Sequence, residues 1–311
     1  MKKVVVTGGA GFIGSHLAEE LAGRGYYVII LDDLSTGRMK NIENLLKKEN
    51  AEFIQGSITD LPLLRKLFQN VEYVFHQAAL SSVPRSMEDS LTTNEVNIKG
   101  TLNVLMAARE NRVRKVVYAA SSSVYGDALA SPQREDMPPN PQSPYAVTKL
   151  AGEYYCQVFY EVFALPTICL RYFNVYGPRQ DPSSQYAAVV PRFIDRLFKD
   201  ESPIIFGDGE QTRDFTFVKD AAEANILATE SDATGVFNIG TGRRVSINEL
   251  ARLITRFTDK DSKPIYQKPR PGDVKHSLAD ISKAKQVGYN PRYNLEEGLR
   301  ETMRGFGQWS V

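Results

Sequence analysis

Strand-length apolar runs alternate with longer mixed stretches over the first half of the chain. The runs are rich in β-branched and other apolar residues, as expected for strands buried on both faces of a sheet. They cover residues 4–6, 27–31, 71–75, 115–119 and 166–171. The stretches between them predict helices over residues 15–24, 61–68, 97–111 and 145–163. Strands that alternate with helices predict an α/β protein with a doubly wound parallel sheet.

The alternation weakens after about residue 173, where segments such as VYGPRQDPSS and KPRPGDVKH separate shorter elements. We therefore expect a first domain over residues 1–173 and a smaller C-terminal substrate-binding domain formed mainly by residues 174–311. The stretches FTFVKDAAEANILATE and VFNIGTG could add a helix and a strand to the first sheet. Residues of about 214–242 are thus expected to return to the first domain.

The composition is that of an ordinary globular protein, with 42% hydrophobic and 24% charged residues among 311. The net charge of +1 offers no broad electrostatic attraction for nucleic acid or for an anionic membrane. No apolar run approaches the roughly 20 residues of a transmembrane helix, and a strand-like run at the N-terminus leaves no room for a signal peptide. We expect a cytoplasmic protein without nucleic-acid or membrane partners.

Metal-ligating residue types are few and scattered. The chain has two cysteines, Cys156 and Cys169, and three histidines, His16, His76 and His276. None of them shows a metal-ligand spacing, so no metal site is expected.

Glycines stand at positions 8, 11 and 14, between the first predicted strand and the first predicted helix. In this context Gly8 permits a tight turn, Gly11 lets backbone N–H groups approach a pyrophosphate, and Gly14 lets the helix pack on the strand. The second strand ends at Asp32, about 18 residues beyond Gly14, where a carboxylate accepts hydrogen bonds from an adenosine ribose. The pattern predicts a Rossmann dinucleotide site that favours NAD, although Arg38 leaves NADP open.

Tyr145 and Lys149 are four residues apart in a predicted helix, so their side chains share one face. A nearby ammonium favours phenolate, and we expect Lys149 to lower the pKa of Tyr145 from about 10 and make it a usable base. Upstream, a predicted strand runs into Ser121, Ser122 and Ser123 at the carboxyl edge of the sheet, where doubly wound folds bind ligands. Together with a dinucleotide, these residues predict a site for hydride and proton transfer.

At these residues the chain resembles the extended short-chain dehydrogenase/reductases, and among them the UDP-hexose 4-epimerases, most of all those acting on UDP-N-acetylglucosamine. The similarity covers nearly the whole chain and includes TGGAGFIG, HQAA, SSSVYG, YAVTK, LRYFNVYGPRQ, FGDGEQTRDFTFVKD, FNIGTG and PRPGDVKHSLADISKA. It implies a 4-epimerase of UDP-sugars with bound NAD and a transient 4-keto intermediate. It also implies that Tyr145 is the acid/base, that Lys149 tunes it and binds the cofactor, and that Ser121 shares the proton of the sugar 4-OH.

The resemblance further implies which residues contact the ligands. Cofactor contacts are expected from Gly8, Gly11, Phe12, Ile13, Asp32, Ser57, Ile58, Ala78, Ala79, Tyr145, Lys149 and Tyr172. Substrate contacts are expected from Val83, Ser122, Ser123, Asn174, Ala188, Val189, Phe206, Arg213, Arg270, Asp273 and Ser277. In the last set, Asn174, Arg213 and Arg270 are implied at the diphosphate, Ala188, Val189 and Phe206 at the uracil, and Asp273 at the uridine ribose.

Two features narrow the reaction and the sugar. Dehydratases that resemble this chain carry an Asp-Glu pair after the catalytic Ser or Thr, and decarboxylating relatives carry a Glu, whereas this chain has Ser122 and Ser123. Without a carboxylate there, the expected fate of the keto sugar is hydride return to its opposite face, which inverts C4.

Ser277 stands where galactose-type epimerases often carry Tyr, and its small side chain leaves space for an acetamido group. We expect UDP-N-acetylglucosamine and UDP-N-acetylgalactosamine as substrates, with UDP-glucose and UDP-galactose left open.

Three alternatives remain at this stage. One is a UDP-glucose 4-epimerase without N-acetyl preference. The second is a UDP-glucuronate 4-epimerase, which calls for an additional cation near the sugar, with Arg85 as a candidate. The third is a non-catalytic NAD-binding sensor, which predicts a broken Tyr or Lys. Two departures from the family pattern are Ser57, where an Asp commonly contacts adenine, and Ser81, where a Lys often lies near the nicotinamide.

A homodimer is also implied, because members of this family commonly pair through a four-helix interface that includes the Tyr145 helix. Leu150, Tyr154, Val158 and Val162 could form an apolar stripe for such an interface, or they could belong to the core.

Overall fold

The computed structural model of the protein describes residues 1–127, 131–182, 188–258, 262–269 and 274–307. At its centre is a seven-stranded sheet with the order β3-β2-β1-β4-β5-β6-β9, in which every neighbouring pair is parallel. The strands are β1 (Lys3–Thr7), β2 (Tyr27–Asp32), β3 (Ala51–Gln55), β4 (Tyr73–His76), β5 (Lys115–Ser121), β6 (Thr167–Tyr172) and β9 (Gly235–Ile239). The prediction of a doubly wound parallel α/β sheet is confirmed.

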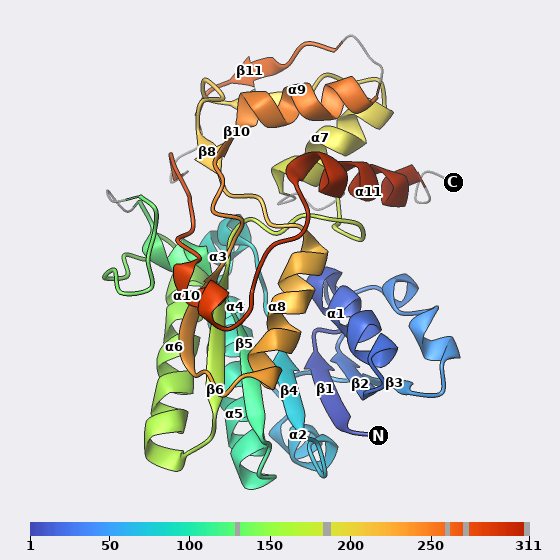
Figure 1. The fold of residues 1–311 in the computed structure, drawn as a ribbon, viewed down its shortest axis with the longest axis vertical. Helices are drawn as coiled ribbons and strands as arrows, with labels where there is room; N and C mark the ends of the chain where they lie inside the picture. The colour runs from blue at the N-terminus through green and yellow to red at the C-terminus, as the bar shows by residue number, and fades with distance from the viewer. Residues whose placement is uncertain (128–130, 183–187, 259–261, 270–273, 308–311) are drawn as a thin grey trace.

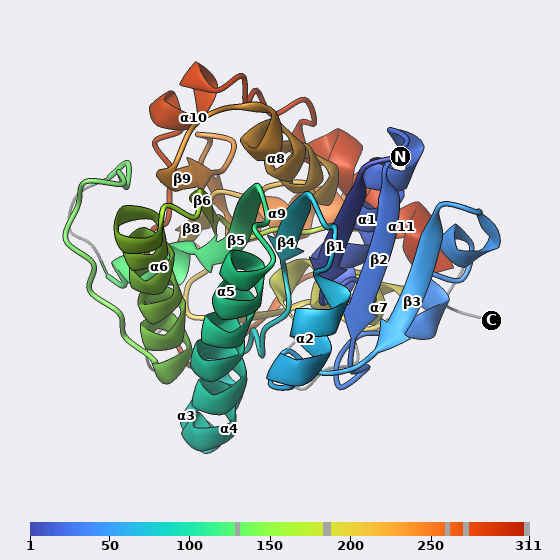
Figure 2. The ribbon, with the colours of Figure 1, turned by 90° about the horizontal axis from the view of Figure 1, so that it is seen from below.

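Helices cover both faces of this sheet (Figures 1 and 2). One layer contains α1 (Phe12–Gly23), α8 (Val218–Glu230) and α10 (Ser282–Gln286), and the other contains α2 (Leu61–Leu67), α5 (Gly100–Glu110) and α6 (Pro144–Phe163). Successive residues of β1 show how the strands serve both layers. Val4 and Val6 pack into the first core cluster, whereas Val5 packs into the second. Burial on both faces explains why the strands appear in the sequence as uninterrupted apolar runs.

The helical path before α5 is longer than the sequence predicted. It begins with α3 (Val83–Glu88) and α4 (Ser90–Asn94) and continues through one π-helical turn, η3 (Glu95–Lys99), into α5. Asp89 accepts a hydrogen bond from the backbone N–H of Thr92 at 3.0 Å and so caps α4. The predicted start at residue 97 was wrong because this cap lies outside the apolar periodicity. Short 3₁₀ turns are η1 (Met39–Asn41), η2 (Leu45–Lys47) and η4 (Ser122–Tyr125).

A second lobe lies beyond the carboxyl ends of the strands (Figure 1). It contains α7 (Val189–Phe198), α9 (Ile247–Phe257) and α11 (Leu295–Gly307), with the strand pairs β7 (Ile204–Phe206) with β11 (Ile265–Gln267) and β8 (Thr212–Arg213) with β10 (Val245–Ser246). Phe193, Ile194, Leu250, Ile254 and Leu299 belong to its own hydrophobic cluster.

The chain crosses between the lobes more than once. After β8 it returns to form α8, which packs on α1, and β9, which pairs with β6, before it leaves again for β10 and α9. The two lobes are therefore joined by segments that are far apart in the sequence. In the ranges described here, no helix has the length and apolar character needed to cross a lipid bilayer.

Candidate active site

The turn between β1 and α1 is built from glycines in close contact. Gly8 has a φ of +67°, and a Cβ atom there would lie 2.7 Å from the backbone N of Ala78. A Cβ on Gly14 would lie 2.2 Å from the carbonyl oxygen of Gly8. Gly11 precedes α1 and supplies no side-chain cap, so the first N–H groups of the helix stay available to a phosphate.

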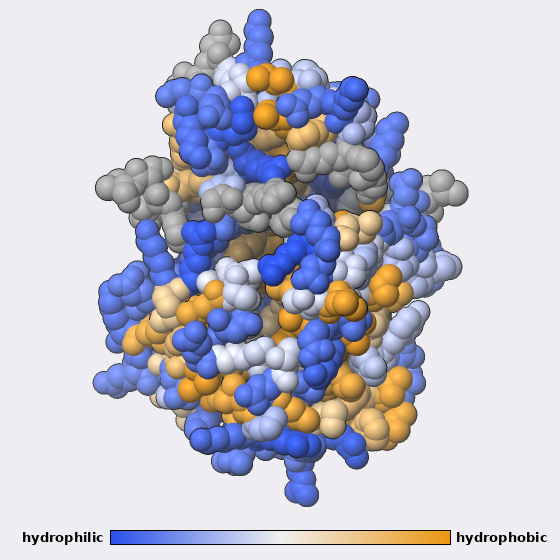
Figure 3. All heavy atoms as spheres, turned by 180° about the vertical axis from the view of Figure 1, so that it is seen from behind, coloured by the Kyte–Doolittle hydropathy of each residue, from blue (hydrophilic) through white to orange (hydrophobic). Residues whose placement is uncertain are grey.

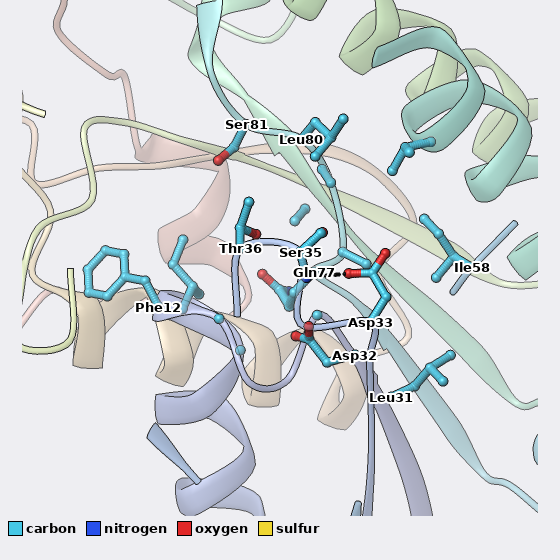
Figure 4. A pocket seen from close by; sticks show the side chains of 18 of the residues that line it. Phe12, Leu31, Asp32, Asp33, Ser35, Thr36, Ile58, Gln77, Leu80 and Ser81 are labelled. Atoms are coloured by element: carbon cyan, nitrogen blue, oxygen red, sulfur yellow. Dashed lines mark hydrogen bonds between the residues drawn. The ribbon is translucent and has the colours of Figure 1, made fainter. Parts of the chain in front are cut away.

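Asp32 closes β2 with its carboxylate held by the backbone. Its Oδ2 accepts from the Ala10 N–H at 3.0 Å and its Oδ1 from the Leu34 N–H at 2.8 Å, while burial raises the pKa of the carboxyl. Figure 4 shows Asp32 and Asp33 next to each other in the lining of the pocket. Arg38, which left NADP open, has its Nη2 atom 2.5 Å from Oδ2 of Asp181. Because this arginine is paired, the site favours an unphosphorylated adenosine ribose.

All twelve residues predicted to contact the cofactor line one cleft, which encloses about 940 Å³ including its open mouth. Sequence reasoning missed several residues of its lining: Ser35, Thr36, Gln77, Leu80, Val96, Ala119 and Ala120. Ser57 and Ser81, the two departures from the family pattern, also line it.

Tyr145, Lys149 and Ser121 meet at one end of this cleft. Ser143 caps α6 by accepting from the Ala146 N–H at 3.2 Å, which fixes the start of the helix directly before Tyr145. The Lys149 ammonium donates to the carbonyl of Ala119 at 2.8 Å and lies 6.0 Å from the ring centroid of Tyr145. The Ser121 hydroxyl is hydrogen-bonded to the Tyr145 phenol.

The prediction that Lys149 lowers the pKa of Tyr145 was wrong for the protein without a bound ligand. Burial raises the pKa of Tyr145, and the hydrogen bond from Ser121 opposes that rise. Burial also lowers the pKa of Lys149 to about 8. The lysine points its ammonium at a backbone carbonyl and is itself desolvated, so its charge does not offset the loss of water around the phenol.

A polar cluster beside the cleft joins the predicted cofactor residue Tyr172 to two residues that sequence reasoning missed, Gln77 and Asn225. Gln77 Nε2 donates to Asn225 Oδ1 at 2.9 Å, and Asn225 Nδ2 donates to the Tyr172 hydroxyl at 2.7 Å. Asn225 belongs to α8, so the returning helix fixes the orientation of a residue that lines the cleft. Gln77 follows β4 directly within HQAA, and its place at a strand end was the available signal.

Ser122 and Ser123 form the start of η4, next to Ser121. The Ser123 N–H donates to Ser121 Oγ at 3.2 Å. Ser123 Oγ is buried and has no hydrogen-bond partner in the part of the chain that the structure describes. A buried hydroxyl without a partner is costly, so this oxygen suits a ligand hydroxyl.

Several predicted substrate residues gather around β8. The Ser277 N–H donates to the Thr212 carbonyl at 3.1 Å, which places Ser277 beside Arg213. Asn174 has a φ of 35°, and its Nδ2 donates to the Asp214 carbonyl at 3.1 Å. The buried carboxylate of Asp214 in turn accepts from the N–H groups of residues 241, 242 and 279. This carboxylate therefore joins three loops next to β8.

The other predicted substrate residues lie on separate elements. Val83 begins α3, Ala188 directly precedes α7, Val189 begins α7, and Phe206 ends β7. Arg270 and Asp273 lie outside the described residues. Among the residues that are described, no group of His, Cys, Asp and Glu has the arrangement of a metal site.

Comparison with known proteins agrees with this geometry. Residues 4–240 match the model of the NAD dependent epimerase/dehydratase family. The chain is 41% identical over 308 residues to a UDP-glucose 4-epimerase of Mycolicibacterium smegmatis, with 98% of each chain covered.

Two solved structures are similar over 99% of both chains. A UDP-N-acetylglucosamine 4-epimerase from Methanobrevibacter ruminantium, in complex with UDP-N-acetylmuramic acid, is 45% identical with a TM-score of 0.96. A UDP-glucuronic acid 4-epimerase from Bacillus cereus, in complex with UDP-glucuronic acid and NAD, is 36% identical with a TM-score of 0.92.

Proposed function

The chain belongs to the NAD dependent epimerase/dehydratase family, and we propose that it interconverts UDP-N-acetylglucosamine and UDP-N-acetylgalactosamine. Its activity at the coarser level is NAD-dependent 4-epimerisation of a UDP-sugar. The preference for an N-acetylated sugar is the part of the function that we propose. It rests on one position, Ser277.

Ser277 is 7% exposed and lies beside Arg213, the residue implied at the diphosphate. A tyrosine at this position would add an aromatic ring to a buried site next to the bound nucleotide sugar. Serine leaves that volume free for an acetamido group at C2. The similarity to the Methanobrevibacter UDP-N-acetylglucosamine 4-epimerase supports the same choice of sugar.

The cleft fits NAD at three points. The uncapped N-terminus of α1 suits the pyrophosphate, Asp32 suits a ribose, and Lys149 reaches the opposite end of the same cleft. When bound, NAD supplies reversible oxidation of the sugar at C4.

The protein's own residues handle the proton. Tyr145 accepts the proton of the sugar 4-OH and later returns it, Ser121 relays it through the shared hydrogen bond, and Lys149 stabilises the phenolate. Ser123 Oγ, which lacks a partner, is placed to bond a sugar hydroxyl. Since Ser122 and Ser123 offer no carboxylate, no second acid or base is available there for elimination, and inversion at C4 is the outcome.

The test is product analysis of the purified protein with UDP-glucose, UDP-galactose, UDP-N-acetylglucosamine, UDP-N-acetylgalactosamine and UDP-glucuronate. Interconversion of the N-acetylated pair is expected. Conversion of UDP-galactose with UDP-N-acetylgalactosamine left untouched would refute the proposed substrate.

UDP-glucuronate is less well supported. Arg85, the candidate cation for a uronate, is the third residue of α3, and its backbone N–H donates to the capping Ser82 Oγ at 3.1 Å. The pKa of the Asp89 carboxyl is lowered first by hydrogen bonds from Thr92 and then by the charge of Arg85. Arg85 therefore has an acidic neighbour on its own segment.

Replacing Ser277 with Tyr is expected to lower kcat/KM for the N-acetylated pair at least about tenfold, because a ring in a close-packed site cannot share space with an acetamido group. UDP-glucose and UDP-galactose, if converted, should be affected much less. The measurement is kcat/KM for both pairs, with Ser277→Ala as the control that keeps the small volume. Equal losses on both pairs would contradict the assignment.

We also propose a homodimer through α6. Tyr154, Val158 and Val162 are 53%, 45% and 65% exposed, whereas Leu150 packs against an internal cluster and is not part of this face. Figure 3 shows apolar side chains on the face of the lower lobe that the α5 and α6 layer covers. Such a face is typical of an interface.

Val158→Arg is expected to convert the dimer to a monomer in light scattering, because a charge placed in an apolar interface is not compensated. Gln157→Arg, a charge on the neighbouring exposed position, is the control. A wild-type protein that is monomeric at assay concentration would contradict the dimer.

A further inference from the structure

A buried ion pair lies one helical turn beyond Lys149 on α6. Arg171 Nε donates to Glu153 Oε1 at 2.9 Å and Arg171 Nη2 donates to Glu153 Oε2 at 2.7 Å. The two side chains are 4% and 5% exposed. Sequence reasoning singled out neither residue.

The pair is embedded among aromatic and amide groups. The Arg171 guanidinium lies 4.7 Å from the ring centroid of Tyr125, whose hydroxyl donates to Asn238 Oδ1 at 2.7 Å. Arg171 Nη1 is buried and finds no hydrogen-bond partner within the described ranges. Buried ion pairs contribute little net stability compared with well-packed apolar residues, so the presence of this one calls for another explanation.

The explanation lies in the surroundings of Lys149. Lys149 is 4% exposed, and its ammonium donates to one backbone carbonyl and lies 5.1 Å from the ring centroid of Tyr118. Burial lowers its pKa, and the largest opposing effect comes from Glu153, followed by Cys156. The titratable groups that face Lys149 are Tyr145, Glu153 and Cys156 on α6, Tyr118 on β5 and His76 on β4. Glu153 is the carboxylate among them.

Glu153 lies closer to Lys149 than to Tyr145 along α6, so its charge acts more strongly on the lysine. It is four residues from Lys149 and eight from Tyr145 on one helix, which corresponds to about 6 Å and about 12 Å along the axis. Two protonation states of the Tyr145–Lys149 pair have the same net charge. One has a phenol and a neutral lysine, and the other has a phenolate and an ammonium. A negative charge nearer to the lysine favours the second state.

We infer that Glu153 is a positioning residue for the catalytic proton: its carboxylate, fixed by Arg171, keeps Lys149 in the ammonium form and so stabilises the phenolate when Tyr145 gives up its proton. Arg171 provides the partner that a carboxylate needs in the core, and its two hydrogen bonds set the carboxylate's orientation. This inference rests on the proposed function only in that it takes Tyr145 as the base.

The test is Glu153→Gln in the NAD-loaded protein, with the phenolate of Tyr145 followed by ultraviolet difference absorbance against pH and Tyr145→Phe as the blank. The pH midpoint at which the phenolate forms is expected to rise by about one unit, which is about a tenfold fall in the phenolate fraction at any pH below that midpoint. Turnover should fall with it through kcat, while KM changes little. Glu161→Gln is the matched control, because Glu161 lies on the exposed part of the same helix, where it accepts from Gln157 at 2.8 Å. An unchanged phenolate fraction in Glu153→Gln would overturn the inference.

A charge swap separates the electrostatic role from a structural one. Glu153→Arg combined with Arg171→Glu restores an ion pair but places a positive charge one turn from Lys149. Stability is expected to recover in the swap, and the phenolate is not. Recovery of both would show that Glu153 acts only by holding the fold. If Glu153→Gln does not fold, Glu153→Gln with Arg171→Met removes both buried charges, and the same loss of phenolate is expected.

The phenolate measurement requires no sugar, so the two proposals can fail separately. A wild-type protein that converts no UDP-sugar would refute the proposed function and would leave the effect of Glu153 measurable. Active enzyme with a phenolate that does not respond to Glu153→Gln would refute this inference alone.

Discussion

Turnover of the UDP-sugar is expected to fall about thousandfold in Tyr145→Phe, the magnitude typical of losing a general acid/base. The substitution removes one oxygen from a partly buried side chain hydrogen-bonded to Ser121 and leaves the ring in the cleft. Cofactor binding should survive, because the glycine turn and Asp32 remain intact. The measurement combines kcat of the variant with its NAD content after purification.

Tyr160→Phe is the matched control for this prediction. Tyr160 belongs to the same helix but is 44% exposed and does not line the cofactor cleft, so its hydroxyl should be dispensable. Near-normal turnover of Tyr145→Phe, or loss of NAD together with activity, would refute the role assigned to Tyr145.

The second large effect is expected from Gly14→Ala, which should destabilise the protein by at least about 3 kcal/mol and abolish NAD retention. The added Cβ would lie 2.2 Å from the Gly8 carbonyl oxygen and 2.9 Å from the Gly9 Cα. Both are backbone atoms of the turn that we propose faces the pyrophosphate, so they cannot rotate away as a side chain would. Thermal unfolding and NAD content measure the two losses.

Gly23→Ala provides the comparison within the same helix. A Cβ at Gly23 would meet nothing within 4 Å, and alanine favours helix more than glycine does. Gly23→Ala should therefore be as stable as the wild type or slightly more so, with NAD retained. A Gly14→Ala protein that keeps its cofactor would show that the turn can open to admit a methyl group.

The sequence was sufficient for features that depend on local order. Strand-length runs such as residues 27–31 predicted the sheet because burial on both faces leaves a continuous apolar pattern. The spacing of Gly8, Gly11 and Gly14, and that of Tyr145 and Lys149, translates directly into one turn and one helix face. The cofactor cleft could be predicted for the same reason, since strand ends of a parallel sheet meet at one edge.

Features that depend on distant pairing could not be predicted. Glu153 and Arg171 look like ordinary charged residues in a helix and a strand, and only the fold buries them together. Asn225 reaches Tyr172 because α8 returns to the first lobe, and Asp214 collects N–H groups from three later positions. The pKa of Tyr145 was misjudged for a related reason, because spacing reveals a nearby charge but not the loss of water around the phenol.

The pairing of β9 with β6 affects how the chain folds during its synthesis. β6 ends at Tyr172, but its partner begins at Gly235, after α7, β7 and β8 have been made. While the ribosome makes residues 173–234, the nascent sheet ends in β6, whose outer hydrogen-bonding edge is unpaired. Apolar residues of β6 such as Ile168 and Leu170 are not yet covered. Until β9 emerges from the ribosome, the first lobe therefore has an unpaired strand edge, which is the kind of surface through which incomplete chains aggregate.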